Sequence, residues 1–293
     1  MGVPFNSEAL PRDGFAEVNG LRHHYLDWGG DWGEPDRPTV LLLHGFAQSG
    51  HSFDFVSLSL CEKFRVIALD LRGHGESDWS KAVDYKRETM LTDVVGIMGH
   101  LGLDSASFVG LSLGGTISYM LAAARPELVR SLVIVDIAPR VEQVGVNRVR
   151  GFVEGDDYFD SLEAMIEAVR AFRPGRTEEQ LKGSVLRNAK RLEDGRWSWK
   201  YDPVMRRAEG RPKTGPDQEN ELWSALEAAA CPALVVRGAE SDIVSPETVA
   251  EMVRRIPDAR AVTVERAGHL VPGDNPVGFI QAIEPFLLDT AAV

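Results

Sequence analysis

One serine of this chain lies in a pattern that can turn a side-chain hydroxyl into a nucleophile. The segment Gly110–Gly114 reads Gly-Leu-Ser-Leu-Gly, with a short apolar run before it and a helix-like run at 115–124 after it. A serine on a sharp turn from strand to helix takes strained backbone, and the glycines leave room for the two elements to cross closely. The turn lifts the hydroxyl clear of the sheet, at the positive end of the helix. We therefore expect Ser112 to be the nucleophile.

A second segment could donate hydrogen bonds to a negatively charged oxygen. The apolar run at 39–43 ends abruptly at His44-Gly45-Phe46, which is typical of a buried parallel strand that leads into a tight loop. In such a loop the backbone N–H of Phe46 can point to the same place as the backbone N–H of Leu113. We expect these two groups to form an oxyanion hole, and Phe46 and Leu113 are also candidates to line a substrate pocket.

Taken together, these segments, the loop at 70–77, Asp242 and Gly268-His269 resemble the α/β-hydrolase superfamily over roughly residues 15–287. The resemblance is to a capped serine carboxylesterase. It implies a mostly parallel eight-stranded sheet with helices on both faces, and a helical cap inserted after the sixth strand. The serine at 112 argues against the branches of this superfamily that use a carboxylate nucleophile.

The resemblance also implies a base and an acid that follow the serine in the chain. His269 comes after the last expected strand, at the carboxyl edge of the sheet, and is assigned as general base and then general acid. Asp242 comes just after the seventh expected strand and is assigned as the acid that orients the histidine. Asp136, at the end of the sixth expected strand, is a rival for this role, and Glu240 is a weaker one.

Strands and helices alternate along most of the chain, which indicates parallel strands joined by right-handed crossovers. Asn19-Gly20 predicts a hairpin with a type I′ turn before this alternation begins. Residues 140–223 interrupt the pattern with helical spacing and no convincing strand. We expect a core of 1–139 and 224–293 and a helical cap of 140–223. The expected elements are strands at 39–43, 65–69, 106–109, 131–136, 233–237 and 260–264, and helices near 52–61, 88–101, 113–124, 246–255 and 275–288.

The chain has 293 residues and a net charge of −12, which argues against nucleic acid and anionic membranes as partners. Its excess of acidic residues lies outside 140–223. Within 140–223 the acidic and basic residues balance. The simpler interpretation is that these charges lie on a solvated surface. The alternative is that cap arginines attract an anionic substrate, and Arg140, just after the sixth expected strand, is the best-placed candidate.

Two cysteines do not make a disulfide framework or a metal site, and neither a signal peptide nor an apolar run of membrane-spanning length is recognisable. We expect no cofactor and no metal, a cytoplasmic location, a small-molecule ester as substrate, and a monomer or homodimer. No nucleic-acid or membrane partner is expected.

The favoured function is hydrolysis of carboxylic esters of small to medium acyl chains through an acyl-enzyme. A C–C bond hydrolase of ring-cleavage diketone acids would use the same triad, and lactonase and perhydrolase activities are further variants. The alternative from another functional class is a ligand-binding protein of the same fold, which barely turns over its ligand. The sequence does not decide which side chains of the cap line the pocket, and it therefore leaves the substrate open.

Overall fold

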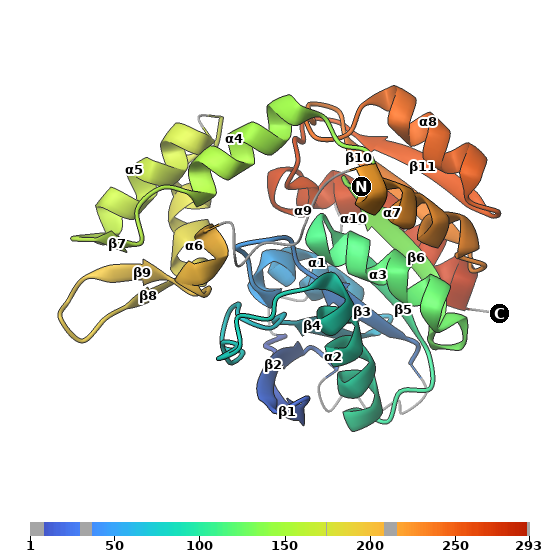
Figure 1. Ribbon diagram of the computed structural model, residues 1–293, viewed down its shortest axis with the longest axis horizontal. Coiled ribbons are helices and arrows are strands. Elements are labelled where there is room, and N and C mark those ends of the chain that lie inside the picture. The colour runs from blue at the N-terminus through green and yellow to red at the C-terminus, as the bar shows by residue number, and fades with distance from the viewer. Residues whose placement is uncertain (1–8, 30–36, 174, 208–215, 292–293) are drawn as a thin grey trace.

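The computed structural model describes residues 9–29, 37–173, 175–207 and 216–291. Its centre is an eight-stranded sheet with the strand order β1-β2-β4-β3-β5-β6-β10-β11 (Figure 1). The strands from β3 onward run parallel to one another, whereas β1 and β2 form an antiparallel pair at one edge. The expected α/β-hydrolase sheet is confirmed. The strand bounds are β1 Arg12–Val18, β2 Leu21–Asp27, β3 Thr39–Leu43, β4 Arg65–Leu69, β5 Ala106–Leu111, β6 Val129–Val135, β10 Ala233–Gly238 and β11 Ala259–Val264.

The hairpin between β1 and β2 has the expected turn. Asn19 and Gly20 have φ angles of 51° and 74°, and Val18 pairs with Leu21 across the turn. Two consecutive positive φ angles define a type I′ turn, whose twist matches that of the strands it joins. The Asn-Gly pair supplies the two residue types that adopt this conformation most readily.

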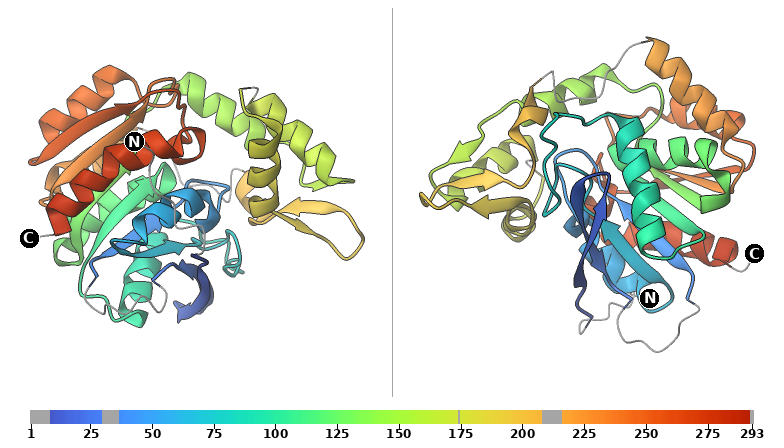
Figure 2. Two further views of the ribbon diagram at one scale, coloured as in Figure 1. Left: turned by 180° about the vertical axis from the view of Figure 1, so that it is seen from behind. Right: turned by 60° about the horizontal axis from the view of Figure 1, so that its bottom comes forward.

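Helices cover both faces of the sheet, because the buried strands are apolar on both sides (Figure 2). One face packs against α2 Arg87–His100, α3 Leu113–Ala124, α7 Pro216–Ala228 and α8 Pro246–Arg255. The other packs against α1 Asp54–Leu60 and α10 Pro276–Ala291. Short helical turns η1 Gly50–Phe53, η2 Pro126–Leu128 and α9 Val271–Asp274 complete this part of the fold. The bounds of β4, α3 and α8 agree with the sequence expectation at both ends.

The segment between β6 and α7 lies to one side of the sheet as a separate layer (Figure 1). It contains α4 Gln143–Val153, α5 Leu162–Phe172, α6 Glu178–Asn188 and the short turn η3 Pro203–Arg206. The capping box formed by Thr177 and Gln180 at the start of α6 is present. Helix α7 packs against α3, and the boundary expected between residues 223 and 224 falls within α7.

The expectation that this segment has no strand is wrong. Strands β7 Tyr158–Phe159, β8 Ala189–Arg191 and β9 Trp197–Trp199 form a three-stranded antiparallel sheet in the order β7-β9-β8. Strands of two or three residues are too short to show a two-residue hydrophobic period, which is why the sequence pattern did not predict them. Across the described ranges, none of the helices is long and apolar enough to span a bilayer.

Candidate active site

Ser112 occupies the turn between β5 and α3. Its φ and ψ angles are 52° and −112°, and its backbone N–H donates to the carbonyl oxygen of Val135 at 3.0 Å. A Cβ atom on Gly110 would lie 2.5 Å from the backbone of Gly114, and one on Gly114 would lie 2.1 Å from the carbonyl oxygen of Leu43. Larger residues at these glycines would force the strand and the helix apart. The local sequence therefore builds the strained turn that was expected, with the serine at the start of α3.

The loop that carries Phe46 lies directly against this turn. A Cβ atom built on Gly45 would be 3.4 Å from the Cβ of Ser112. The backbone N–H of Gly114 donates to the carbonyl oxygen of His44 at 3.2 Å, and that of Gly45 donates to Oε1 of Gln48 at 3.2 Å. These contacts fix the loop 44–46 relative to the start of α3, where the backbone N–H of Leu113 lies.

His44 has a supporting role in this arrangement. Its Nε2 accepts a hydrogen bond from the backbone N–H of Leu71 at 3.0 Å, and its Nδ1 lies 2.7 Å from the carbonyl oxygen of Gly45. Complete burial lowers the pKa of His44. The neutral ring thus joins the loop after β3 to the loop after β4, and it is not free to act as a base.

His269 lies in the loop after β11, and its partner is Asp136 at the end of β6. The distance from Nδ1 of His269 to Oδ2 of Asp136 is 2.8 Å, and both side chains are buried. Asp136 also accepts hydrogen bonds from the backbone N–H of Gly238 at 3.2 Å and from Oγ of Ser241 at 2.6 Å. A carboxylate held in this way fixes the orientation of the imidazole and leaves Nε2 free for chemistry.

The expectation that Asp242 orients His269 is wrong. The two oxygens of Asp242 accept hydrogen bonds from Nε and Nη2 of Arg148, at 2.6 and 2.7 Å. This two-point contact with Arg148 lowers the pKa of Asp242 and raises that of Arg148. Asp242 therefore joins its loop to helix α4, while the rival considered from the sequence, Asp136, contacts the histidine.

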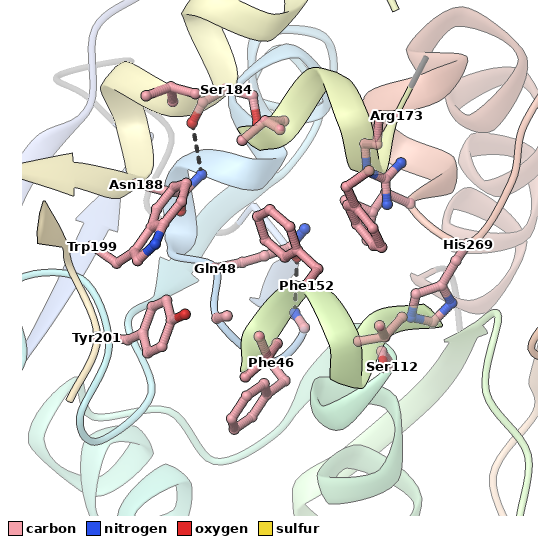
Figure 3. Close-up of a pocket in the computed structure, with 18 residues that line it drawn as sticks. Phe46, Gln48, Ser112, Phe152, Arg173, Ser184, Asn188, Trp199, Tyr201 and His269 are labelled. Atoms are coloured by element: carbon pink, nitrogen blue, oxygen red, sulfur yellow. Dashed lines mark hydrogen bonds between the residues drawn. The ribbon is translucent and has the colours of Figure 1, made fainter. Parts of the chain in front are cut away.

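Ser112 and His269 line one pocket between the core and the segment above it, and Figure 3 shows the two side chains next to each other. Between the two described side chains there is no direct hydrogen bond, which is common where no substrate is bound. The cavity has a volume of about 90 Å³. Most of its wall is apolar and aromatic, with Phe152 stacked on Phe172 at a centroid distance of 4.4 Å. The aromatic lining residues are Phe46, Phe152, Phe172, Trp199 and Tyr201.

The structure places the three substrate-binding candidates differently. Phe46 lines the pocket, whereas Leu113 is buried and is not part of its wall. Arg140 is half exposed, forms an ion pair with Glu251 and also lies outside the wall. The arginine in the pocket is Arg173, at the end of α5. No sequence pattern distinguishes Arg173 from the other arginines of this segment, because the chain direction after α5 depends on how the upper layer packs on the core.

The described residues contain no group of three or more His, Cys, Asp or Glu side chains that could hold a metal ion. The polar groups that line the pocket include the hydroxyl of Ser112, the imidazole of His269 and the guanidinium of Arg173. A hydroxyl next to an imidazole that a buried carboxylate orients is an arrangement that can carry out nucleophilic acyl transfer.

Comparison with known proteins identifies the family of this chain. A family model described as alpha/beta hydrolase fold matches residues 38–276. The chain belongs to this family. This α/β hydrolase is similar to Esterase Rv0045c of Mycobacterium tuberculosis, with 34% identity over 90% of the chain and 86% of the relative. It is also similar to a 3-hydroxybutyrate-oligomer hydrolase of Cupriavidus necator, with 32% identity over 89% of the chain and 92% of that relative.

The fold is also similar to that of solved α/β hydrolases. A crystal structure of an α/β hydrolase from Novosphingobium aromaticivorans superposes with a TM-score of 0.83 and 30% identity, over 97% of this chain and all of the other. The likeness extends over the core and the layer above it, since nearly every residue of both chains is covered. The protein is therefore a hydrolase of the esterase-like type within this superfamily.

Proposed function

We propose that this α/β hydrolase cleaves carboxylic esters of small to medium acyl chains through a covalent acyl-enzyme on Ser112. The observation that carries the proposal is the chain of contacts from Asp136 to His269, with His269 and Ser112 on one pocket wall. The relatives whose names describe an esterase and a hydrolase of 3-hydroxybutyrate oligomers support ester cleavage.

The reaction begins when His269 Nε2 accepts the hydroxyl proton of Ser112 and the serine oxygen attacks the ester carbonyl. Asp136 stabilises the imidazolium that forms, because its Oδ2 accepts the hydrogen bond from Nδ1. The carbonyl oxygen gains negative charge and is bound by the backbone N–H groups of Phe46 and Leu113. The imidazolium then protonates the departing alcohol, which leaves the acyl group on Ser112.

Water enters as the alcohol leaves, and the same groups act a second time. His269 removes a proton from the water, which attacks the acyl carbonyl, and the oxyanion forms again at the same two N–H groups. When the tetrahedral intermediate collapses, the imidazolium returns a proton to the oxygen of Ser112 and the acid is released. No cofactor takes part in these steps.

The segment from α4 to η3 would act as a cap that limits the size of the substrate. The cavity beside the serine is small, about 90 Å³, and its walls come from both the core and the cap. We infer that the described residues from 140 to 207 form this cap and that the described residues before 140 and from 216 onward form the core, so that α7 belongs to the core.

The test is a series of initial rates on p-nitrophenyl esters of increasing acyl length, for the wild-type enzyme and Ser112→Ala side by side. We expect turnover by the wild type that is highest for short acyl chains and falls to the background rate in the variant. Labelling of Ser112 by a fluorophosphonate, detected by mass spectrometry, reports the activated serine independently of the substrate.

The remaining outcomes separate the alternatives. Labelling without turnover of any ester would favour a specialised substrate, such as a ring-cleavage diketone acid or a lactone. Neither labelling nor turnover would contradict the proposal and favour a ligand-binding protein.

A further inference from the structure

Arg173 places a positive charge in the wall of the catalytic pocket. It directly follows α5, and its side chain is 11% exposed. Figure 3 shows it on the same side of the pocket as His269. The eighteen residues of the wall include no acidic side chain, and Arg173 is the one among them with a permanent charge. A guanidinium at this position faces the space that a substrate of Ser112 must occupy.

Most of the hydrogen-bond donors of Arg173 have no partner among the residues that the structure describes. A guanidinium has five N–H groups in a planar fork. Within the described part of the chain, Arg173 donates one side-chain hydrogen bond, from Nη1 to Oδ1 of Asp274 at 3.2 Å. Arg148 is different, because its Nε and Nη2 hold both oxygens of Asp242. Arg173 therefore keeps donors for an acceptor that is not part of the protein.

The charges around Arg173 do not balance. Asp274 is shared with Arg176, whose Nε and Nη2 lie 3.1 and 2.6 Å from the same Oδ1 atom. The other oxygen of Asp274 accepts the backbone N–H of Gly268 at 3.0 Å. With the Arg148–Asp242 pair included, three guanidiniums face two carboxylates among the described side chains of this cluster. Burial and the neighbouring Arg176 lower the pKa of Arg173 to about 10, so it stays protonated at neutral pH without full compensation.

We propose that Arg173 binds a carboxylate of the substrate, so that the preferred substrates are short esters with a free carboxylate a few bonds from the scissile carbonyl. A planar carboxylate matches the fork of a guanidinium, and such charge-assisted hydrogen bonds are strong where water is excluded. The link between the two groups is short, because Ser112 and Arg173 line the same pocket. This inference names the substrate class of the proposed esterase and rests on that proposed function.

The kinetic test uses two pairs of matched esters, followed by acid release at constant pH. Monoethyl succinate is paired with ethyl levulinate, in which a methyl ketone replaces the carboxylate on the acyl side. The second pair, 3-acetoxypropanoate and 4-acetoxy-2-butanone, makes the same change on the alcohol side. We expect the wild type to have the higher kcat/KM for the carboxylate member of at least one pair.

The variant Arg173→Gln should lower kcat/KM for that carboxylate ester about 10- to 100-fold, the range for a lost hydrogen bond to a charged group. We expect the neutral partner to change less than about threefold, and Arg173→Lys to restore part of the loss. Arg140→Gln is the matched control, since Arg140 is a cap arginine in an exposed ion pair outside the pocket. Arg173→Gln should still fold, because Arg176 remains on Asp274.

Equal losses for the charged and the neutral ester would overturn the inference, as would a wild type without preference. A binding measurement separates this result from failure of the proposed function. In the Ser112→Ala background, calorimetry with monoethyl succinate should show binding that the added Arg173→Gln change weakens about 10- to 100-fold. If this difference is found but Ser112 neither reacts with a fluorophosphonate nor cleaves esters, the carboxylate site stands and the esterase proposal fails. Equal binding by both variants would overturn the carboxylate site.

Discussion

Asp136 has a backbone conformation that few residues other than glycine adopt. Its φ angle is 47°, and its backbone N–H donates to the carbonyl oxygen of Val236 at 2.8 Å. Aspartate and asparagine tolerate this region better than other side chains do. The strain is held by the hydrogen bonds of the carboxylate, and it turns the end of β6 so that the side chain meets His269. Strained backbone at both Asp136 and Ser112 is consistent with a functional site.

Asparagine substitutions at the two aspartates test which of them serves the histidine. Asp136→Asn should lower kcat by roughly 10⁴, because an amide cannot stabilise the imidazolium and favours the wrong tautomer. Asparagine also tolerates the positive φ angle, so the fold should survive. Asp242→Asn should keep kcat within about tenfold of wild type, since it changes a contact with Arg148. If Asp242→Asn lowered kcat on p-nitrophenyl acetate more than Asp136→Asn did, Asp242 would be the residue that orients His269.

At the scale of elements, helix α4 is joined to the core by close backbone contact as well as by charge. A Cβ atom on Gly145 would lie 2.2 Å from the carbonyl oxygen of Asp242. The backbone N–H of Glu142 donates to the carbonyl oxygen of Ile243 at 2.9 Å. Since Val149 and Phe152 of the same helix line the pocket, the position of α4 determines the shape of the pocket wall.

Two glycines of α4 form a matched pair for testing this contact. Gly145→Ala should lower the melting temperature and reduce kcat/KM, because the added methyl group collides with backbone and pushes the helix outward. Gly151→Ala adds the same group where no atom lies within 4 Å. It should leave kcat/KM unchanged and stabilise the helix by up to about 1 kcal/mol. Equal effects of the two substitutions on melting temperature and on kcat/KM would contradict the role given to the α4 contact.

Elements that depend on local sequence were predicted well. The runs that form β4, α3 and α8 have the right bounds, since their apolar periods and glycine or proline boundaries act within a few residues. The short strands of the cap were missed because they are stabilised by pairing with one another. The boundary between cap and core was placed inside α7, because the sequence does not show that this helix packs against α3.

At the scale of the whole molecule, buried histidines link the loops under the active site. The rings of His44 and His74 have centroids 5.0 Å apart, and Phe46 lies 5.8 Å from His74. Burial, together with the neighbouring His44, lowers the pKa of His74 to about 3. The folded protein therefore holds a neutral imidazole where the unfolded chain would be protonated below its ordinary pKa of 6.5.

This arrangement predicts a loss of stability in acid. Between pH 6.5 and 3 the unfolded chain binds a proton at His74 that the native state does not, so the free energy of unfolding falls as the pH falls. At pH 5 the loss from His74 is about 2 kcal/mol. His44 and His23, whose pKa values are also lowered by burial, act in the same direction. Burial also lowers the pKa of His24, but the hydrogen bonds and charges of Asp70 and Asp13 together outweigh burial and raise it, so His24 acts in the opposite direction.

Urea unfolding at pH 7.5 and pH 5.0 measures this effect. His74→Asn should lose less stability between the two pH values than the wild type does. The control is His100→Asn, at an exposed position at the end of α2, which should keep the wild-type difference. The same pH dependence in all three proteins would show that His74 titrates freely in the native state.

The sequence by itself determined the features that depend on short stretches of chain. These are Ser112 on its turn, the glycines that make the turn possible, and the position of His269 after the last strand. Only the tertiary structure decided which carboxylate serves the histidine and which arginine enters the pocket. Asp136 and Asp242 both follow strands that are neighbours in the sheet, so each could reach the same edge. Which of the two aspartates contacts His269 depends on Arg148, which comes from the cap and binds Asp242. Such a contact joins residues 94 positions apart and depends on packing between layers, which no local pattern encodes.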